Sequence, residues 1–384
     1  WRRMVAAYRR FLGTLLYEAY SEARRLVRTV DPHHLVSFRM TEAGDPTFSW
    51  GDRVPYDYPY LAAAVDLLEP EAYGRIGDWV RVKPALFQMA YARWAAPELP
   101  VLWAEAGVHV WSMSAMAPTQ DKLAFQAEYY GHIYRMLIES AADVIFFWWY
   151  PGGYRVNERS DYGIVNPDGS DRPVTHVIRA HAQPFTEGPE KPPVDHWIEI
   201  DRDLHPAGVP GIYQNTGDAF WDAREKGLTP GLRTAGTGTT SADCPLTAVG
   251  NTPFGKAKPL KYLDGFFDRV EVWTGDAWTH GEDGGEVVAP DGLGLRARAR
   301  ITNLGEATWL APDAETQDGR VYVLVDHTLI PLPKDVPPRT SVMASYLPVG
   351  AAPVHVSLRL AVKRDGRTIP FGPRYRLTLA PNTP

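Results

Sequence analysis

The chain has 384 residues, of which 45% are hydrophobic and 22% charged, as in an ordinary soluble globular protein of two or three domains. The formal net charge of −6 argues against nucleic acid as a partner, because no basic surplus is present to neutralise phosphates. A single cysteine, Cys244, excludes a disulfide framework within the chain, and no apolar run is long enough to predict a membrane span. The 11 histidines show no metal-ligand spacing, so no metal and no other cofactor is expected.

Helix-period and strand-like segments alternate over the first half of the chain. Apolar side chains recur at helical spacing over residues 1–30, and Thr119 is a candidate N-cap for a helix that continues to about residue 138. Further helices are expected at 84–95 and after Arg172-Pro173, and strands at 34–39, 62–68, 100–105 and 143–149. This order predicts an α/β fold, in which a parallel sheet is connected by crossover helices.

The pattern changes after a Pro/Gly-rich stretch at residues 186–193. From about residue 266 the chain alternates polar and apolar residues, which predicts an immunoglobulin-like β-sandwich. Its expected strands include 269–273, 295–302, 320–325 and 354–362. We therefore expect three domains, at 1–185, 186–265 (a linker and mixed accessory region) and 266–384. The segment 303–309 resembles a hairpin of accessory modules in secreted enzymes. The sequence does not fix the location, and a secreted or periplasmic one is preferred to a cytoplasmic one.

The residues that could carry chemistry stand at the predicted strand ends. Glu105 ends the strand 100–105, and a carboxylate at the end of a buried strand is costly unless it is paired or used. Trp148 and Trp149 end the strand 143–149, and because they are adjacent we expect their side chains to point to opposite faces, with Trp149 toward the site. Arg39, Glu71 and Tyr73 end or follow the two preceding strands. In a (β/α)8 barrel such ends meet at one face, where the active site lies.

Two motifs resemble the last two strands of a retaining glycoside hydrolase barrel of clan A: Trp103-Ala-Glu-Ala-Gly107 and the run from Trp149 to Gly163. The resemblance covers about residues 1–185 and implies the C-terminal half of a (β/α)8 TIM barrel. It implies that Glu105 is the nucleophile. The family often has His-x-Tyr at the end of strand six, whereas this chain has Glu71-Ala-Tyr73.

The resemblance also bears on the second carboxyl group of the reaction. In the family, the acid/base is a Glu that follows an Asn at the end of strand four. By this alignment that residue would lie before Trp1, so residues 1–384 by themselves are expected to be inactive. If they are active, Glu71 and Glu42 are the first candidates for the second carboxylate.

The residues and the resemblance together predict a hydrolase that cleaves a β-linked oligo- or polysaccharide with retention, through a glycosyl ester on Glu105.

Several of the candidate site residues also have a purely structural interpretation. Glu105 could be an ion-paired structural residue and Arg39 part of a barrel-mouth ion pair. Glu71 could be a loop carboxylate, and Glu158, a possible substrate contact, could form only a local salt bridge. The competing functions are a non-catalytic carbohydrate-binding or structural barrel protein, and a barrel enzyme that uses Glu105 as a general base.

Overall fold

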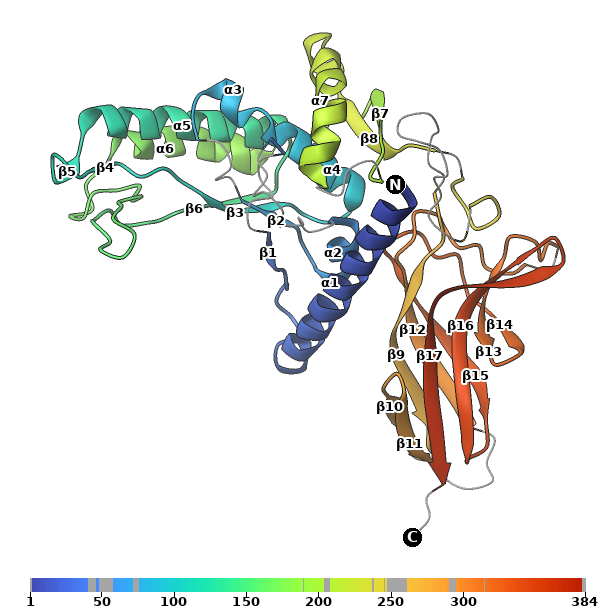
Figure 1. Ribbon diagram of the computed structural model, residues 1–384. Coiled ribbons are helices and arrows are strands. Elements are labelled where there is room, and N and C mark those ends of the chain that lie inside the picture. Colours follow the sequence, from blue (N-terminus) through green and yellow to red (C-terminus); the bar gives the residue numbers. More distant parts are fainter. Residues whose placement is uncertain are drawn as a thin grey trace. The chain divides into compact units, whose positions relative to one another are not determined.

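The computed structural model describes residues 2–40, 46–47, 58–71, 76–188, 190–203, 208–236, 238–244, 246, 261–289, 295–313 and 315–381. Contacts between residues divide the chain into two compact units, whose elements are labelled in Figure 1. The α/β unit is Glu22–Arg233, and the β-rich unit combines Trp1–Ser21 with Thr234–Pro384. This division differs from the three expected domains, because residues 190–233 group with the α/β part and the start of the first helix groups with the C-terminal strands.

The α/β unit contains most of the helices of the chain. Its elements, with the first helix shared between the units, are α1 (Arg2–Val30), β1 (Arg39–Met40), α2 (Tyr58–Ala64), β2 (Glu69–Pro70), α3 (Trp79–Val82), α4 (Ala85–Ala95), β3 (Leu102–Ala106), β4 (Trp111–Ser112), β5 (Ala117–Pro118), α5 (Gln120–Glu139), β6 (Val144–Phe147), α6 (Pro173–Glu187), β7 (His196–Ile200), α7 (Val209–Glu225) and β8 (Pro230–Thr234). Helices α4 and α5 are the expected crossover helices, since each lies in the chain between two of the parallel segments.

Four extended segments of this unit pair in parallel and in chain order. β1 pairs with β2 through Arg39 and Glu69, and β3 pairs with β6 through Leu102 and Val144. Parallel bridges between Leu68 and Val101 and between Glu71 and Glu105 connect the segment around β2 to β3. The predicted parallel arrangement is therefore confirmed for these four segments, and their carboxyl ends lie at a common edge.

Two of the expected strands are wrong in position or extent. Residues 62–64 form the end of helix α2, and only Glu69–Pro70 is a strand. The three consecutive alanines favour a helix, and a segment that is buried on all sides shows no period to separate helix from strand. Residues 34–38 are not a strand either, because the Val36 amide donates to the Asp66 carboxylate (2.8 Å) rather than to a neighbouring strand.

The β-rich unit is built from two sheets that share one hydrophobic core. Its strands are β9 (Gly265–Trp273), β10 (Trp278–Gly281), β11 (Gly285–Ala289), β12 (Leu295–Asn303), β13 (Val321–Val325), β14 (Thr328–Pro331), β15 (Ser341–Gly350), β16 (Val354–Arg364) and β17 (Arg367–Pro381). They form a four-stranded sheet, β10-β9-β12-β15, and a five-stranded sheet, β11-β17-β16-β13-β14. On β12, Ala297 and Ala299 are buried in the common core while Arg296 and Arg300 are exposed, as the period of two predicts.

The first part of α1 belongs to the β-rich unit through polar contacts. The hydroxyl groups of Tyr17 and Thr302 both donate to the carboxylate of Asp268 on β9, the latter at 2.7 Å. Arg10 forms an ion pair with Asp264 at 3.0 Å. These contacts explain why an amphipathic helix at the start of the chain groups with strands that lie more than 250 residues later.

Candidate active site

The parallel register brings two carboxylates side by side. Glu71 directly follows β2, Glu105 lies in β3, and the two residues form a parallel bridge. Glu71 is only 3% exposed, whereas Glu105 is half-buried. Residues paired in this way on adjacent strands point to the same face, with backbones about 4.8 Å apart. The two carboxylate side chains therefore project from neighbouring positions of one face.

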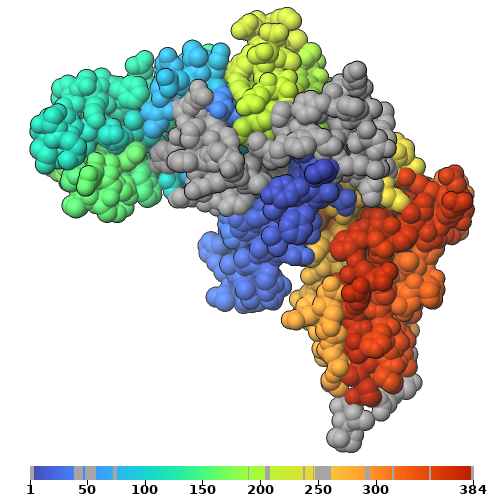
Figure 2. Space-filling view, viewed as in Figure 1, coloured from blue at the N-terminus to red at the C-terminus, as the bar shows by residue number. Residues whose placement is uncertain are grey.

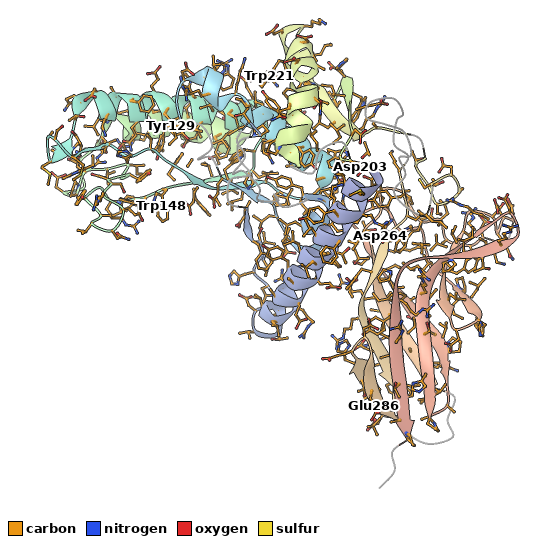
Figure 3. The ribbon with its side chains drawn as sticks, viewed as in Figure 1. Tyr129, Trp148, Asp203, Trp221, Asp264 and Glu286 are labelled. Atoms are coloured by element: carbon orange, nitrogen blue, oxygen red, sulfur yellow. The ribbon has the colours of Figure 1, made fainter. Side chains whose placement is uncertain are left out.

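Trp148 and Trp149 follow directly on β6 and reach the same edge. The Trp148 amide donates to the Ala106 carbonyl at 2.9 Å, so the chain beyond β6 runs beside the end of β3 (Figure 3). Gly107 permits this close approach, because a side chain there would collide with the Trp148 carbonyl oxygen. The two indole rings contact each other edge to face, with centroids 5.7 Å apart. The expectation of opposite faces is therefore wrong, since β6 ends at Phe147 and strand alternation does not govern the residues beyond it.

Arg155 covers the tryptophan pair. Its guanidinium carbon lies 5.3 Å from the Trp148 ring centroid and 4.4 Å from that of Trp149. Glu158 holds the guanidinium in an ion pair at 3.0 Å and accepts a hydrogen bond from Ser160 at 3.4 Å. Glu158 thus has the local salt bridge that was its structural alternative, and its possible contact with substrate stays a prediction. Each such cation–π contact stabilises the arrangement by about 0.5–2 kcal/mol.

A buried ion pair fixes the loop that carries these residues. Arg172, the N-cap of α6, contacts Asp161 with two hydrogen bonds of 2.7 and 3.1 Å, and both side chains are at most 1% exposed. Arg172 also donates to the Gly163 carbonyl (2.6 Å) and to the Asn166 side chain (3.0 Å). Because an isolated buried charge is very costly, these bonds hold the loop after β6 in one position against α6.

Further aromatic side chains extend from the tryptophan pair. The Tyr162 ring lies 5.3 Å from that of Trp149 and 5.9 Å from the imidazole of His109. Burial, and secondarily the positive charge of Lys122, lowers the pKa of His109, so its neutral form is favoured. A second ring pair, Trp111 with Tyr154 at 4.7 Å, connects the β4–β5 hairpin to the loop after β6.

Sequence reasoning found only part of this site. Arg39 contributes its backbone to β1, where it pairs with Glu69, and Tyr73 lies outside the described residues. The roles of Arg155, Tyr162 and Asp161 were not predicted. The run from Trp149 to Gly163 did point to this loop, but which of its side chains pair depends on a fold that the local sequence does not specify.

The described part of the chain holds neither a metal-binding cluster nor a helix suited to span a membrane. No cluster of three or more His, Cys, Asp or Glu side chains that could hold a metal ion is found there. Within the same residues, no helix combines the length and the apolarity that crossing a membrane requires.

Comparison with known proteins gives partial structural likeness. No family model matches the chain, and no curated protein matches it. Among solved structures, GH5_18 from Streptomyces cattleya in complex with GlcNAc is 15% identical, with a TM-score of 0.36 over 47% of this chain and 46% of that one. Xylanase 10B from Thermotoga maritima is 13% identical, with a TM-score of 0.32 over 44% and 52%. An endo-beta-1,4-mannanase from Thermotoga petrophila is 13% identical, with a TM-score of 0.31 over 96% and 62%.

The chain spans about half the length of the first two of these structures. TM-scores below 0.5 do not define a common fold, and the identities are low, so these likenesses do not assign the chain to a family.

Proposed function

We propose that the chain belongs to a retaining glycoside hydrolase and carries its nucleophile, Glu105. The observation on which this proposal depends is the parallel bridge that places Glu71 and Glu105 side by side at one edge of the sheet. The tryptophan pair beyond β6 lies at the same edge, and aromatic faces are suited to stacking on sugar rings. The resemblance of the motifs around Glu105 and Trp149 to clan A enzymes supports the same assignment.

The proposed reaction proceeds in two displacements. The Glu105 carboxylate attacks the anomeric carbon while the second carboxyl group donates its proton to the leaving oxygen, so the glycosidic bond breaks and a glycosyl ester and a carboxylate form. Water then attacks the same carbon, with its proton taken by the second carboxyl group, and releases the sugar with retained configuration. We propose that Trp149 forms the sugar platform, that Arg39 and Tyr73 keep Glu105 ionised, and that Glu158 contacts substrate or orients Arg155.

The second carboxyl group has two candidate sources. The resemblance places it upstream of Trp1, in a preceding part of the barrel. On the chain itself the candidates are Glu71, which is adjacent to Glu105 in register and almost fully buried, and Glu42, which lies outside the described residues. Substitution separates these sources, because the acid/base contributes about 10²–10⁴-fold to the rate.

At the level of the fold, we propose that the α/β unit is the C-terminal half of a (β/α)8 barrel. Its four parallel segments in chain order support this proposal. We propose that the β-rich unit is an immunoglobulin-like sandwich with an accessory role, supported by its two sheets around one core. A secreted or periplasmic location would suit an enzyme that acts on polysaccharides.

The alternative function is a non-catalytic carbohydrate-binding protein. One feature supports this alternative. Glu71 stands where the resembled family often has the His of its His-x-Tyr motif, so the surroundings of Glu105 differ from those in these enzymes.

The distinguishing experiment uses the protein expressed from its complete reading frame and assayed on aryl β-glycosides. Hydrolysis by the wild type that falls by several orders of magnitude in Glu105→Gln supports the enzyme. Sugar binding without hydrolysis, equal in the wild type and in Glu105→Gln, supports the binding protein. Glu71→Gln is the third arm. A loss that is restored by substrates with a good leaving group identifies Glu71 as the acid/base.

A further inference from the structure

A pocket of about 250 Å³ lies on the β-rich unit between β16 and β17. Its lining includes Gly284, His355, Ser357, Arg374, Arg376 and Thr378. The register explains this composition, since Ser357 pairs with Arg376 and His355 with Thr378 on adjacent antiparallel strands. Val356 and Leu377 also line the pocket, although both are buried and belong, with Leu358, to the core cluster, so the exposed part of the lining comes from the outer face of the five-stranded sheet. Figure 2 shows the residues of β17, in red, at the surface of this unit.

The lining supplies hydrogen-bond donors and positive charge. Arg374 and Arg376 follow each other on the outer face of β17 and are both exposed. The His355 ring and the Thr378 hydroxyl lie 3.1 Å apart, with Ser357 beside them on β16. None of the lining residues is an Asp or Glu. The lining residues themselves therefore carry positive charge, on a chain whose formal net charge is −6.

The two arginines differ from other arginines of the β-rich unit. Arg269 and Arg298 both contact Glu271, at 3.0 and 2.6 Å, and Arg320 forms an ion pair with Asp313. Within the described ranges, no carboxylate forms such an ion pair with Arg374 or Arg376.

Two exposed carboxylates flank the pocket: Asp283 directly precedes the lining residue Gly284, and Glu286 on β11 pairs in register with Thr378. Asp283 accepts from the Arg376 amide at 2.7 Å, and Asp326 accepts from the Ser357 amide at 2.9 Å. Within the described ranges neither Asp283 nor Glu286 forms an ion pair with Arg374 or Arg376, so both guanidinium groups remain available to an external anion.

We propose that this pocket binds the anionic substituent, a carboxylate or a sulfate ester, of one unit of an acidic polysaccharide. The choice of a polysaccharide as ligand rests on the proposed function, because it assumes that the glycosidase acts on such a polymer. Guanidinium groups bind carboxylates and tetrahedral oxyanions with paired hydrogen bonds, and the adjacent hydroxyl and imidazole groups suit a sugar ring. The volume lies below the range of about 300–1,000 Å³ typical of sites for drug-sized ligands, which fits a single sugar unit.

Nucleic acid is a less suitable occupant. Proteins that bind single strands stack successive bases on aromatic side chains, and the lining contains no Phe, Tyr or Trp. The net negative charge of the chain also opposes a long polyanion of high charge density.

The test is affinity electrophoresis of the whole chain in gels that contain polygalacturonate, dextran sulfate or neutral dextran. The double variant Arg374→Gln/Arg376→Gln removes both guanidinium groups. Its matched control, Lys334→Gln/Arg367→Gln, removes the same charge from exposed positions of the same unit outside the pocket. We expect the wild type and the control to be retarded in at least one acidic gel. The apparent affinity of the pocket variant there should be at least about tenfold lower, and retardation should weaken with added salt. The two acidic gels distinguish a carboxylate from a sulfate ester.

Several results would overturn the inference. The first two are equal retardation of the wild type and the pocket variant in the acidic gels, and no retardation of the wild type in either acidic gel. The other two are retardation of the wild type in neutral dextran equal to that in the acidic gels, and arginine-dependent binding of a single-stranded oligonucleotide that is tighter than binding of the acidic polysaccharides. Melting temperatures verify folding, since exposed substitutions of this kind change stability by about 0.5 kcal/mol or less. The Glu105→Gln variant should bind like the wild type, so failure of the proposed hydrolysis and failure of this site are distinguishable.

Discussion

Asp161→Asn should strongly destabilise the α/β unit, because it leaves the Arg172 guanidinium buried without a counter-charge. The two side chains are 0% and 1% exposed, and their two hydrogen bonds measure 2.7 and 3.1 Å. Removing one partner of such a pair costs about 3–5 kcal/mol. Asn keeps the volume of Asp, and Arg172 keeps its bonds to Gly163 and Asn166, so we expect a value near the lower limit. For a unit of this size, about 3 kcal/mol corresponds to a fall of about 6–12 °C in melting temperature.

Differential scanning calorimetry measures the fall in melting temperature, and a substitution of Asp171 supplies the control. Asp171 directly precedes Arg172 and forms an ion pair with Arg179 on α6, but the side chains of Asp171 and Arg179 are 35% and 61% exposed. Asp171→Asn should therefore cost about 1 kcal/mol or less. Near-ultraviolet circular dichroism should also change in Asp161→Asn, since the same loop carries the ring cluster around Trp149. If the two variants melted together, the loop would not depend on the buried pair, and the reasoning would be refuted.

Two further predictions concern stability. Burial raises the pKa of Asp268 above its ordinary value of 3.8, although Tyr17 and Thr302 donate to it. The folded state then binds this proton more tightly than the unfolded state, so the contribution of Asp268 to stability is greatest below pH 3.8 and is lost as the pH rises through the folded pKa. Asp268→Asn, which resembles the protonated acid, should raise the melting temperature at pH 7 and lose this advantage at pH 3.5; a constant difference would contradict the shift. Gly107→Ala should cost about 1–3 kcal/mol in urea denaturation because its Cβ would collide with the Trp148 carbonyl. Gly131→Ala in α5, whose nearest contact is 3.9 Å, should instead stabilise by about 0.4–1 kcal/mol, and equal effects would contradict the close approach of β3 and β6.

The elements with a clear hydrophobic period could be predicted from the sequence. Helix α5 has one apolar face with Leu123, Ile133 and Leu137 buried, and β12 alternates buried Ala with Arg. Each of these segments has one face toward solvent and the opposite face toward the core, and only then does the spacing of apolar residues reveal the type of element. Helix α2 is buried on nearly every side, so its sequence contained no such contrast.

The candidate site could be predicted only as far as strand ends could be recognised. Glu105, Glu71 and the tryptophans were identified in this way, and the parallel register brings the first two together. The Asp161–Arg172 pair joins a loop to a helix cap, and such a pairing depends on tertiary structure. The arginine over the tryptophans depends on the same loop conformation.

The central claim is that Glu105 is the nucleophile, and covalent trapping tests it most directly. The protein from the complete reading frame is incubated with a panel of 2-deoxy-2-fluoro-β-glycosides that carry an activated leaving group. The fluorine slows hydrolysis of the glycosyl ester, so the labelled carboxylate can be identified by peptide mass mapping. The account predicts one sugar per chain, on the peptide that contains Glu105, with no label in Glu105→Gln. Labelling of Glu71 or another residue, or hydrolysis of the parent glycosides that persists in Glu105→Gln, would contradict it.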